Sequence, residues 1–138
     1  MILARTLVAA LVAIFLTSSA QARESVPIID HASILLSRPD GRTLTRDMVR
    51  DAIIRGAAVR SWSTAPGGDG VLVATIVVRG KHTVVVEIPF AADRFGVRYK
   101  SSVNMNHAMR DGRPVIHPNY NRWVLNLIDA IRNETMRN

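Results

Sequence analysis

Residues 71–89 decide the fold, and they read VLVATIVVRGKHTVVVEIP. Two runs within this stretch, 71–78 and 83–88, are rich in valine, isoleucine and threonine and are typical of β-strands. Gly80 and Lys81 between the runs suit the turn of a hairpin. Apolar residues alternate in the second run, so we expect one side of the hairpin to be buried and the other to face water.

A third strand is predicted over 95–101, where apolar and basic residues alternate strictly. The apolar set is Phe95, Val97 and Tyr99, and the basic set is Arg94, Arg98 and Lys100. Successive side chains of a strand point to opposite faces, so the basic set should lie on the outer face of the sheet. The three strands together predict an antiparallel meander.

Two amphipathic helices flank this meander. Residues 43–58 carry an apolar stripe at the helical period, and the hydroxyl of Thr45 is placed to cap the helix start. Over 118–133 the stripe is continuous and includes Tyr120 and Trp123, which we expect in the core rather than in a ligand platform. The prediction is an α+β fold of order α-β-β-β-α, with both helices packed on one face of a three-stranded antiparallel meander.

The start of the chain predicts an export signal. Arg5 is followed by an uninterrupted apolar run from Leu7 to Leu16 and by Ala20-Gln21-Ala22, which presents small residues to a signal peptidase. The run is shorter than the roughly 20 apolar residues of a membrane-spanning helix. We therefore expect a signal peptide over 1–22 that is cleaved after Ala22, an extended N-terminal arm over 23–42, and a single α+β domain over 43–138.

Charge and cysteine content narrow the classes of partner. The full chain has a net charge of +7 and no cysteine, which excludes disulfides, thiol catalysis and thiolate metal sites. A basic balance ordinarily suggests nucleic acid, but a periplasmic or secreted protein meets little of it. We expect an anionic envelope lipid or glycan, or a periplasmic protein, as the partner. We expect no cofactor and no transmembrane segment in the mature chain.

Two polar clusters stand out beside the predicted elements. Residues 99–104 read YKSSVN and end the third strand, and residues 116–127 read IHPNYNRWVLNL and open the last helix. A strand end and a helix start can meet in this layout, and the N–H groups of a helix start favour an anion. His117 or Asn119 caps the helix. The candidate binding residues in the two clusters are Ser101, Ser102, Asn104, His117, Asn119 and Asn121, beside the basic set of the third strand.

The two clusters resemble the pattern Y-x-S-S-x-N followed by I-H-x-N-Y-N-x-W-V-x-N-L of a family of small exported bacterial proteins, periplasmic or lipoprotein-like, of uncharacterised function. The resemblance extends over residues 45–131. The matching residues are Tyr99, Ser101, Ser102, Asn104, Ile116, His117, Asn119, Tyr120, Asn121, Trp123, Val124, Asn126 and Leu127. The chain departs from the family in lacking a lipoprotein cysteine and in having Met105 and His107 where leucine and tyrosine are usual. The resemblance implies export and a shared fold, and it implies no particular activity.

A hydrolase is the alternative function. Ser101 or Ser102 could form a triad with His117 and Asp111, but neither serine lies in a Gly-x-Ser-x-Gly elbow. The histidines also lack the spacing of metal ligands, so we expect no metal site. The sequence therefore predicts an exported, soluble, non-catalytic binding module of the bacterial envelope. The alternative is an enzyme that acts on envelope polymers through Ser101 or Ser102 with His117.

Overall fold

The computed structural model describes residues 23–137, which form two helices and eight strands. The helices are α1 (Arg46–Val59) and α2 (Asn119–Met136). The strands are β1 (Val26–Pro27), β2 (His31–Leu35), β3 (Ser63–Pro66), β4 (Val71–Val78), β5 (His82–Ala91), β6 (Arg94–Val103), β7 (Ala108–Arg110) and β8 (Arg113–Ile116). The predicted signal peptide, residues 1–22, lies outside the described residues.

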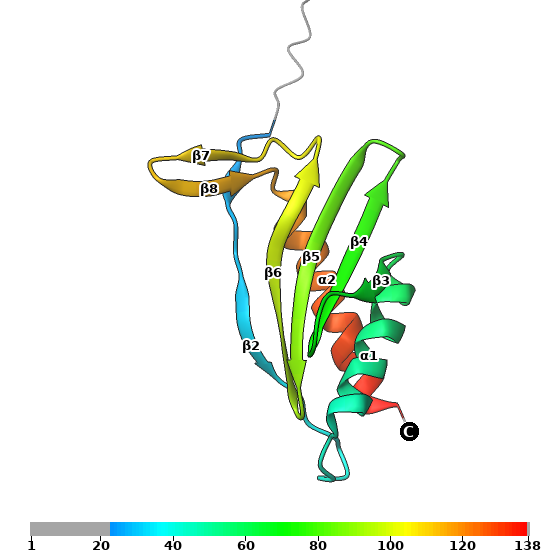
Figure 1. The fold of residues 1–138 in the computed structure, drawn as a ribbon. Helices are drawn as coiled ribbons and strands as arrows, with labels where there is room; N and C mark the ends of the chain where they lie inside the picture. Colours follow the sequence, from blue (N-terminus) through cyan, green and yellow to red (C-terminus); the bar gives the residue numbers. More distant parts are fainter. Residues whose placement is uncertain (1–22, 138) are drawn as a thin grey trace, which may run out of the picture.

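The strands form two antiparallel sheets (Figure 1). The larger sheet has five strands in the order β2-β6-β5-β4-β3, and the smaller has three in the order β1-β8-β7. The prediction of a single three-stranded meander is therefore wrong. The segments of that meander make up the centre of the larger sheet as β4, β5 and β6, and an additional strand pairs on each side of them.

The additional strand β2 comes from the segment predicted as an extended arm. It pairs with β6, but the register shifts between His31 and Ile34, which interrupts the alternation that marks a strand in a sequence. Gly96 of β6 lies beside this irregularity, because an added Cβ would be only 2.8 Å from the carbonyl oxygens of His31 and Ala32. A strand with this register shift has no regular period of two, so the sequence pattern does not predict it.

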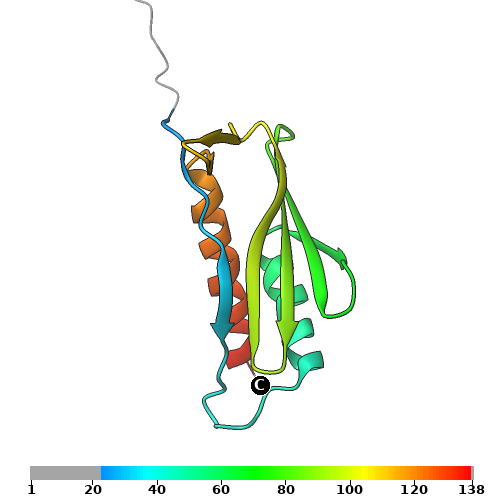
Figure 2. The same ribbon diagram turned by 60° about the vertical axis from the view of Figure 1, so that its left-hand side comes forward.

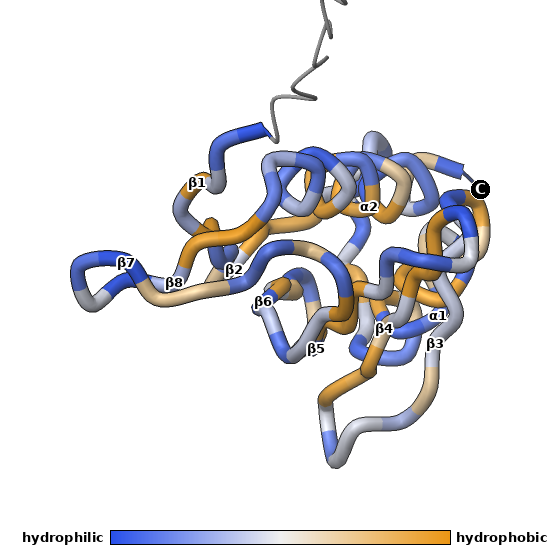
Figure 3. The backbone as a smooth tube through the Cα atoms, turned by 90° about the horizontal axis from the view of Figure 1, so that it is seen from above, coloured by the Kyte–Doolittle hydropathy of each residue, from blue (hydrophilic) through white to orange (hydrophobic). Residues whose placement is uncertain are grey.

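The other missed strands are short. β3 pairs with β4 at the opposite edge of the larger sheet and ends at Pro66, a residue that sheets tolerate at their edges. The hairpin of β7 and β8 lies within 104–118, which the sequence predicts as one long connection. Its turn has positive φ at Asp111 (50°) and Gly112 (73°). Seen from above, this hairpin projects from the body of the molecule, and its tip is hydrophilic (Figure 3).

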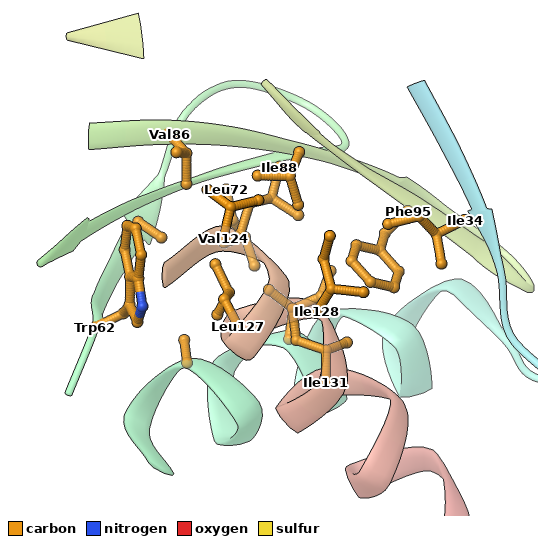
Figure 4. Packing of buried hydrophobic residues seen from close by; sticks show 14 of the residues in the cluster. Ile34, Trp62, Leu72, Val86, Ile88, Phe95, Val124, Leu127, Ile128 and Ile131 are labelled. Atoms are coloured by element: carbon orange, nitrogen blue, oxygen red, sulfur yellow. The ribbon is translucent and has the colours of Figure 1, made fainter. Parts of the chain in front are cut away.

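Both helices lie on one side of the larger sheet (Figures 1 and 2). The main core fills the space between them and the sheet (Figure 4). From β5, the side chains of Val84, Val86 and Ile88 are fully buried, and they meet the apolar stripe of α2. Burial of each such side chain stabilises the fold by about 1.5–3 kcal/mol. Neither helix of the described chain combines the length and hydropathy that crossing a bilayer requires.

The two helices approach each other most closely at Gly56 of α1. A Cβ added to Gly56 would lie 2.7 Å from the Cα and N atoms of Ile131 and 2.9 Å from the carbonyl carbon of Ala130. Only a residue without a side chain fits there. The start of α1 is as predicted, because the Thr45 hydroxyl accepts a hydrogen bond from the N–H of Met48 at 3.2 Å.

Candidate functional site

The start of α2 is organised by His117. Its Nδ1 atom accepts a hydrogen bond from the N–H of Asn119 at 3.1 Å, and its carbonyl oxygen accepts one from the N–H of Tyr120 at 3.0 Å. Pro118 already has helical dihedral angles, φ −55° and ψ −25°, and so occupies the first helical position, where its missing N–H costs nothing. Of the two predicted capping residues, His117 is therefore the one whose side chain caps the helix.

The turn between β4 and β5 lies at the same end of the molecule as the start of α2 (Figure 1). Arg79 and Gly80 both have positive φ, 55° and 64°, as a type I′ hairpin turn requires. Asn104, at the end of β6, fastens this turn, because its Nδ2 atom donates to the carbonyl oxygen of Lys81 at 2.8 Å. Its own carbonyl oxygen lies 2.7 Å from Nδ1 of His82. A carbonyl oxygen only accepts, so Nδ1 of His82 carries the proton of this hydrogen bond.

A cavity of about 240 Å³ lies between the β4–β5 turn and the start of α2. We call it the basic pocket. Its lining residues are Val78, Arg79, His82, Met105, His117, Asn119, Arg122 and Trp123. No carboxylate of the described chain lines the basic pocket, and neither Arg79 nor Arg122 is ion-paired with a carboxylate among residues 23–137. The cavity therefore presents positive charge and hydrogen-bond donors.

The electrostatics around His117 agree with this description. Burial lowers the pKa of His117 below its usual value of 6.5, and the charges of Arg23, His82 and Arg122 lower it further. A neutral imidazole with an accepting Nδ1 carries its proton on Nε2. His117 can therefore cap α2 through one ring nitrogen and donate through the other.

The predicted basic set of the third strand lies on the outer face of the larger sheet, on the side away from the helices. There its charges are paired. Arg98 donates to Glu87 at 2.9 Å and lowers the pKa of that carboxyl group. Lys100 is 3.9 Å from the same carboxylate, and Arg94 is 3.0 Å from Asp93. The outer face is thus a mixed surface, with an acid beside each of the three bases.

The two candidate serines do not reach His117. Ser101 is exposed and pairs with Val85, on the outer face of the sheet. Ser102 lies 2.8 Å from the Tyr99 hydroxyl through its Oγ atom. Within the described residues, no hydrogen bond joins either serine or Asp111 to His117, and neither serine lines the basic pocket. The described residues therefore do not bring Ser101, Ser102 or Asp111 together with His117 in the arrangement of nucleophile and base that a triad needs.

The other predicted residues have structural partners. Asn121 holds the arm, because its side chain accepts from the N–H of Ile29 at 3.1 Å and donates to the carbonyl oxygen of Pro27 at 2.9 Å. Asn119 accepts from Arg122 at 2.6 Å and thereby orients that guanidinium beside the pocket. Of the six candidate binding residues named in the two clusters, His117 and Asn119 line the basic pocket, and the other four do not.

The expectation for the aromatic residues of α2 is half correct. Tyr120 is fully buried in the core, as predicted, and its hydroxyl has no hydrogen-bond partner among the described residues. Burial raises the pKa of Tyr120 well above its usual value. Trp123 is only partly buried, packs against the core with one part and lines the basic pocket. The fully buried tryptophan is Trp62, which follows α1.

The sequence did not predict that three basic residues would meet in the pocket: Arg79, His82 and Arg122. They come from two regions more than 30 residues apart in the chain, and no local spacing connects them. A partial signal was the arginine at a turn position where glycine or asparagine is preferred. In residues 23–137, no three potential metal ligands come together, at His82 and His117 or elsewhere.

Two further hollows lie near the C-terminal end of α2 and differ in character. One has about 110 Å³ and the other about 600 Å³, and both are lined by Arg55, Glu134 and Arg137. The buried Glu134 carboxylate is 3.1 Å from Arg55 and 3.6 Å from Arg137. The charges there satisfy one another, so we regard these hollows as part of the packing between the helices.

Comparisons with family models, with curated proteins and with solved structures gave no match to this chain. The resemblance of its two polar clusters to a family of small exported proteins therefore stays a prediction.

Proposed function

We propose that the protein is an exported, non-catalytic binding module of the bacterial envelope, and that it recognises an anionic group of an envelope component in the basic pocket. The proposal rests on a difference between two sets of basic side chains: those of the pocket have no acidic partner among the described residues, and those of the outer face do. Arg79 and Arg122 line a cavity without a carboxylate, whereas the basic residues of the outer face each lie beside an acid. An anion entering the pocket would supply the countercharge that residues 23–137 do not.

The backbone at Arg79 supports the same proposal. A left-handed conformation is uncommon outside glycine, asparagine and aspartate, and strain of this type costs about 1–3 kcal/mol. Four of the six described non-glycine residues with positive φ are asparagine or aspartate, and Arg79 and Ser61 are the exceptions. An arginine at a strained backbone position beside a cavity is consistent with a binding role.

The proposal does not include hydrolysis. Nδ1 of His117 is occupied in capping α2. A general base also needs a nucleophile within hydrogen-bond reach. The pocket lining contains no serine, threonine, aspartate or glutamate among the described residues. Its polar groups are suited to holding an anion in place.

The test compares two double variants of the mature chain on captured lipopolysaccharide, whose phosphates provide anionic groups, by surface plasmon resonance. The first variant, Arg79→Asn with Arg122→Gln, removes two charges from the pocket. The second, Arg94→Gln with Arg98→Gln, removes two charges from the outer face. Since a hydrogen bond to a charged group contributes about 1.5–3 kcal/mol, the pocket variant should bind at least about tenfold more weakly than the parent, and the outer-face variant should bind like the parent.

The two variants have the same net charge, so a general loss of attraction would weaken both equally. Equal weakening of both variants would contradict binding in the basic pocket. A loss of binding in the outer-face variant alone would place the binding site on the outer face of the sheet. Asparagine accepts the left-handed backbone of residue 79 better than arginine, so the pocket variant is not expected to fail through misfolding.

A further inference from the structure

The shape of the basic pocket and the proton positions in it narrow the class of ligand. This inference rests on the proposed function, because it concerns the same site.

The cavity is larger than a single small anion. A water molecule occupies roughly 30 Å³ in the liquid, so a volume of about 240 Å³ corresponds to about eight waters. Inorganic phosphate or sulfate would leave much of this space unfilled. The ligand should therefore carry its anionic group on a larger organic part.

The cavity wall can accommodate such a part. Val78, Met105 and Trp123 contribute apolar surface, while the arginines and His117 contribute donors. The indole of Trp123 is partly exposed here because the core behind it covers only one side. A sugar ring presents both hydroxyl groups and apolar C–H faces, and an aromatic side chain in a small-molecule site packs against surfaces of this kind.

The tautomers distinguish between anions. His117 presents Nε2–H as a donor, because its Nδ1 accepts from Asn119. His82 has the opposite arrangement. Its Nδ1 donates to the carbonyl of Asn104, so in the neutral ring Nε2 is an acceptor. Among several donors, the basic pocket thus contains one imidazole nitrogen that accepts a hydrogen bond.

A phosphate monoester can donate this hydrogen bond. Its second pKa is about 6, so near neutral pH part of it keeps a P–OH group. That P–OH group donates to Nε2 of His82, while the other phosphate oxygens accept hydrogen bonds from the arginines and His117. A sulfate ester or a carboxylate carries no proton near neutral pH and only one negative charge.

We propose that the basic pocket binds a phosphate monoester attached to a sugar-sized organic group. The two arginines and His117 donate to the phosphate oxygens, and Nε2 of His82 accepts a hydrogen bond from the P–OH group. The source of the group is either a free sugar phosphate or a phosphorylated headgroup displayed on a lipid, and the same contacts serve both.

The experiment follows the fluorescence of Trp123 in the mature chain near neutral pH. The probes are glucose 6-phosphate, glucose 6-sulfate, glucuronate and inorganic phosphate. Glucose 6-phosphate should bind most tightly. The sulfate and the carboxylate have no proton to donate to Nε2 of His82, so they should bind several-fold and at most about tenfold more weakly, the effect of one hydrogen bond that is not made. Trp123→Phe is the control for the reporter, since Trp62 is buried in the core and should not respond.

A second variant tests the role of His82. His82→Gln should reduce the preference for phosphate over sulfate while retaining binding of both, because the arginines stay in place. Vesicles containing phosphatidic acid, compared with vesicles of phosphatidylcholine, separate the two sources. Binding to the vesicles without binding to glucose 6-phosphate would assign a lipid headgroup, and the reverse would assign a free sugar phosphate.

Two results would overturn the proposal, and they differ in what else they affect. Equal affinity for glucose 6-phosphate and glucose 6-sulfate would reject the phosphate assignment and leave anion binding in place. The second result is that neither fluorescence nor isothermal calorimetry detects binding of any of these anions or vesicles. Both the phosphate assignment and the proposed function would then be wrong.

Discussion

Gly56→Ala tests the packing of the two helices that supports the whole sheet. The added Cβ would lie 2.7 Å from backbone atoms of Ile131, and backbone cannot move aside by changing a rotamer. α1 and α2 would have to separate, and overpacking of a core costs about 1–3 kcal/mol. We expect the upper end of that range because the obstructing atoms belong to a helix. Alanine gains about 1 kcal/mol over glycine in helix propensity, so the net destabilisation should be about 2 kcal/mol.

Urea denaturation followed by circular dichroism measures this difference. Ala58→Gly is the matched control, since Ala58 is exposed on the same helix and its replacement changes propensity without changing the interface. That variant should lose at most about 1 kcal/mol. If Gly56→Ala instead raised the free energy of unfolding by about 1 kcal/mol, the close approach of the helices would be refuted.

Three further predictions concern the helix start, the core and the chain terminus. The folded-state pKa of His117 is below its usual value of 6.5, so its contribution to stability is complete above that value and is lost as the pH falls through the folded-state pKa. His117→Asn keeps a side-chain acceptor at the helix start that does not titrate. The variant should therefore lose less unfolding free energy than the parent between about pH 7.5 and about pH 5. If both lost the same amount, His117 would not be the group that titrates at this helix start. Tyr120→Phe removes a buried hydroxyl without a partner and should raise the unfolding free energy by about 1 kcal/mol, whereas a clear loss in denaturation experiments would reveal a bonded hydroxyl. If the predicted signal peptide is cleaved, mass spectrometry of the protein from a periplasmic fraction should find Arg23 as the first residue, and an intact Met1 in that fraction would contradict cleavage after Ala22.

The parts of the fold that the sequence predicts are those with regular periods. The alternation in β5 and β6 and the stripe of α2 identify buried faces because one side of each element meets the core. β2, β3, β7 and β8 do not have such patterns. They are short or irregular, and each is held by pairing with another strand: β2 pairs with β6, β3 with β4, and β8 with both β7 and β1. Tertiary context, which a window of sequence does not contain, decides their conformation.

The candidate site could be predicted in part for the same reason. His117 and Asn119 stand at a helix start, which is visible in the sequence, and both line the basic pocket. The alternation along β6 also shows in the sequence that Arg98 and Lys100 point to the outer face. Their ion pairs with Glu87, however, depend on the register between β5 and β6. The convergence of the β4–β5 turn with α2 depends on the complete topology.

The most direct test of the central claim is an NMR titration of the isotope-labelled mature chain with glucose 6-phosphate, glucose 6-sulfate and glucuronate. An anion bound in the basic pocket should shift the backbone amides of Arg79, His82, Asn119 and Arg122 and the indole N–H of Trp123 more than any others. Glucose 6-phosphate should cause the largest shifts. If all three anions left these signals unmoved, or if the shifts clustered at Arg94, Arg98 and Lys100, the basic pocket would not be the binding site.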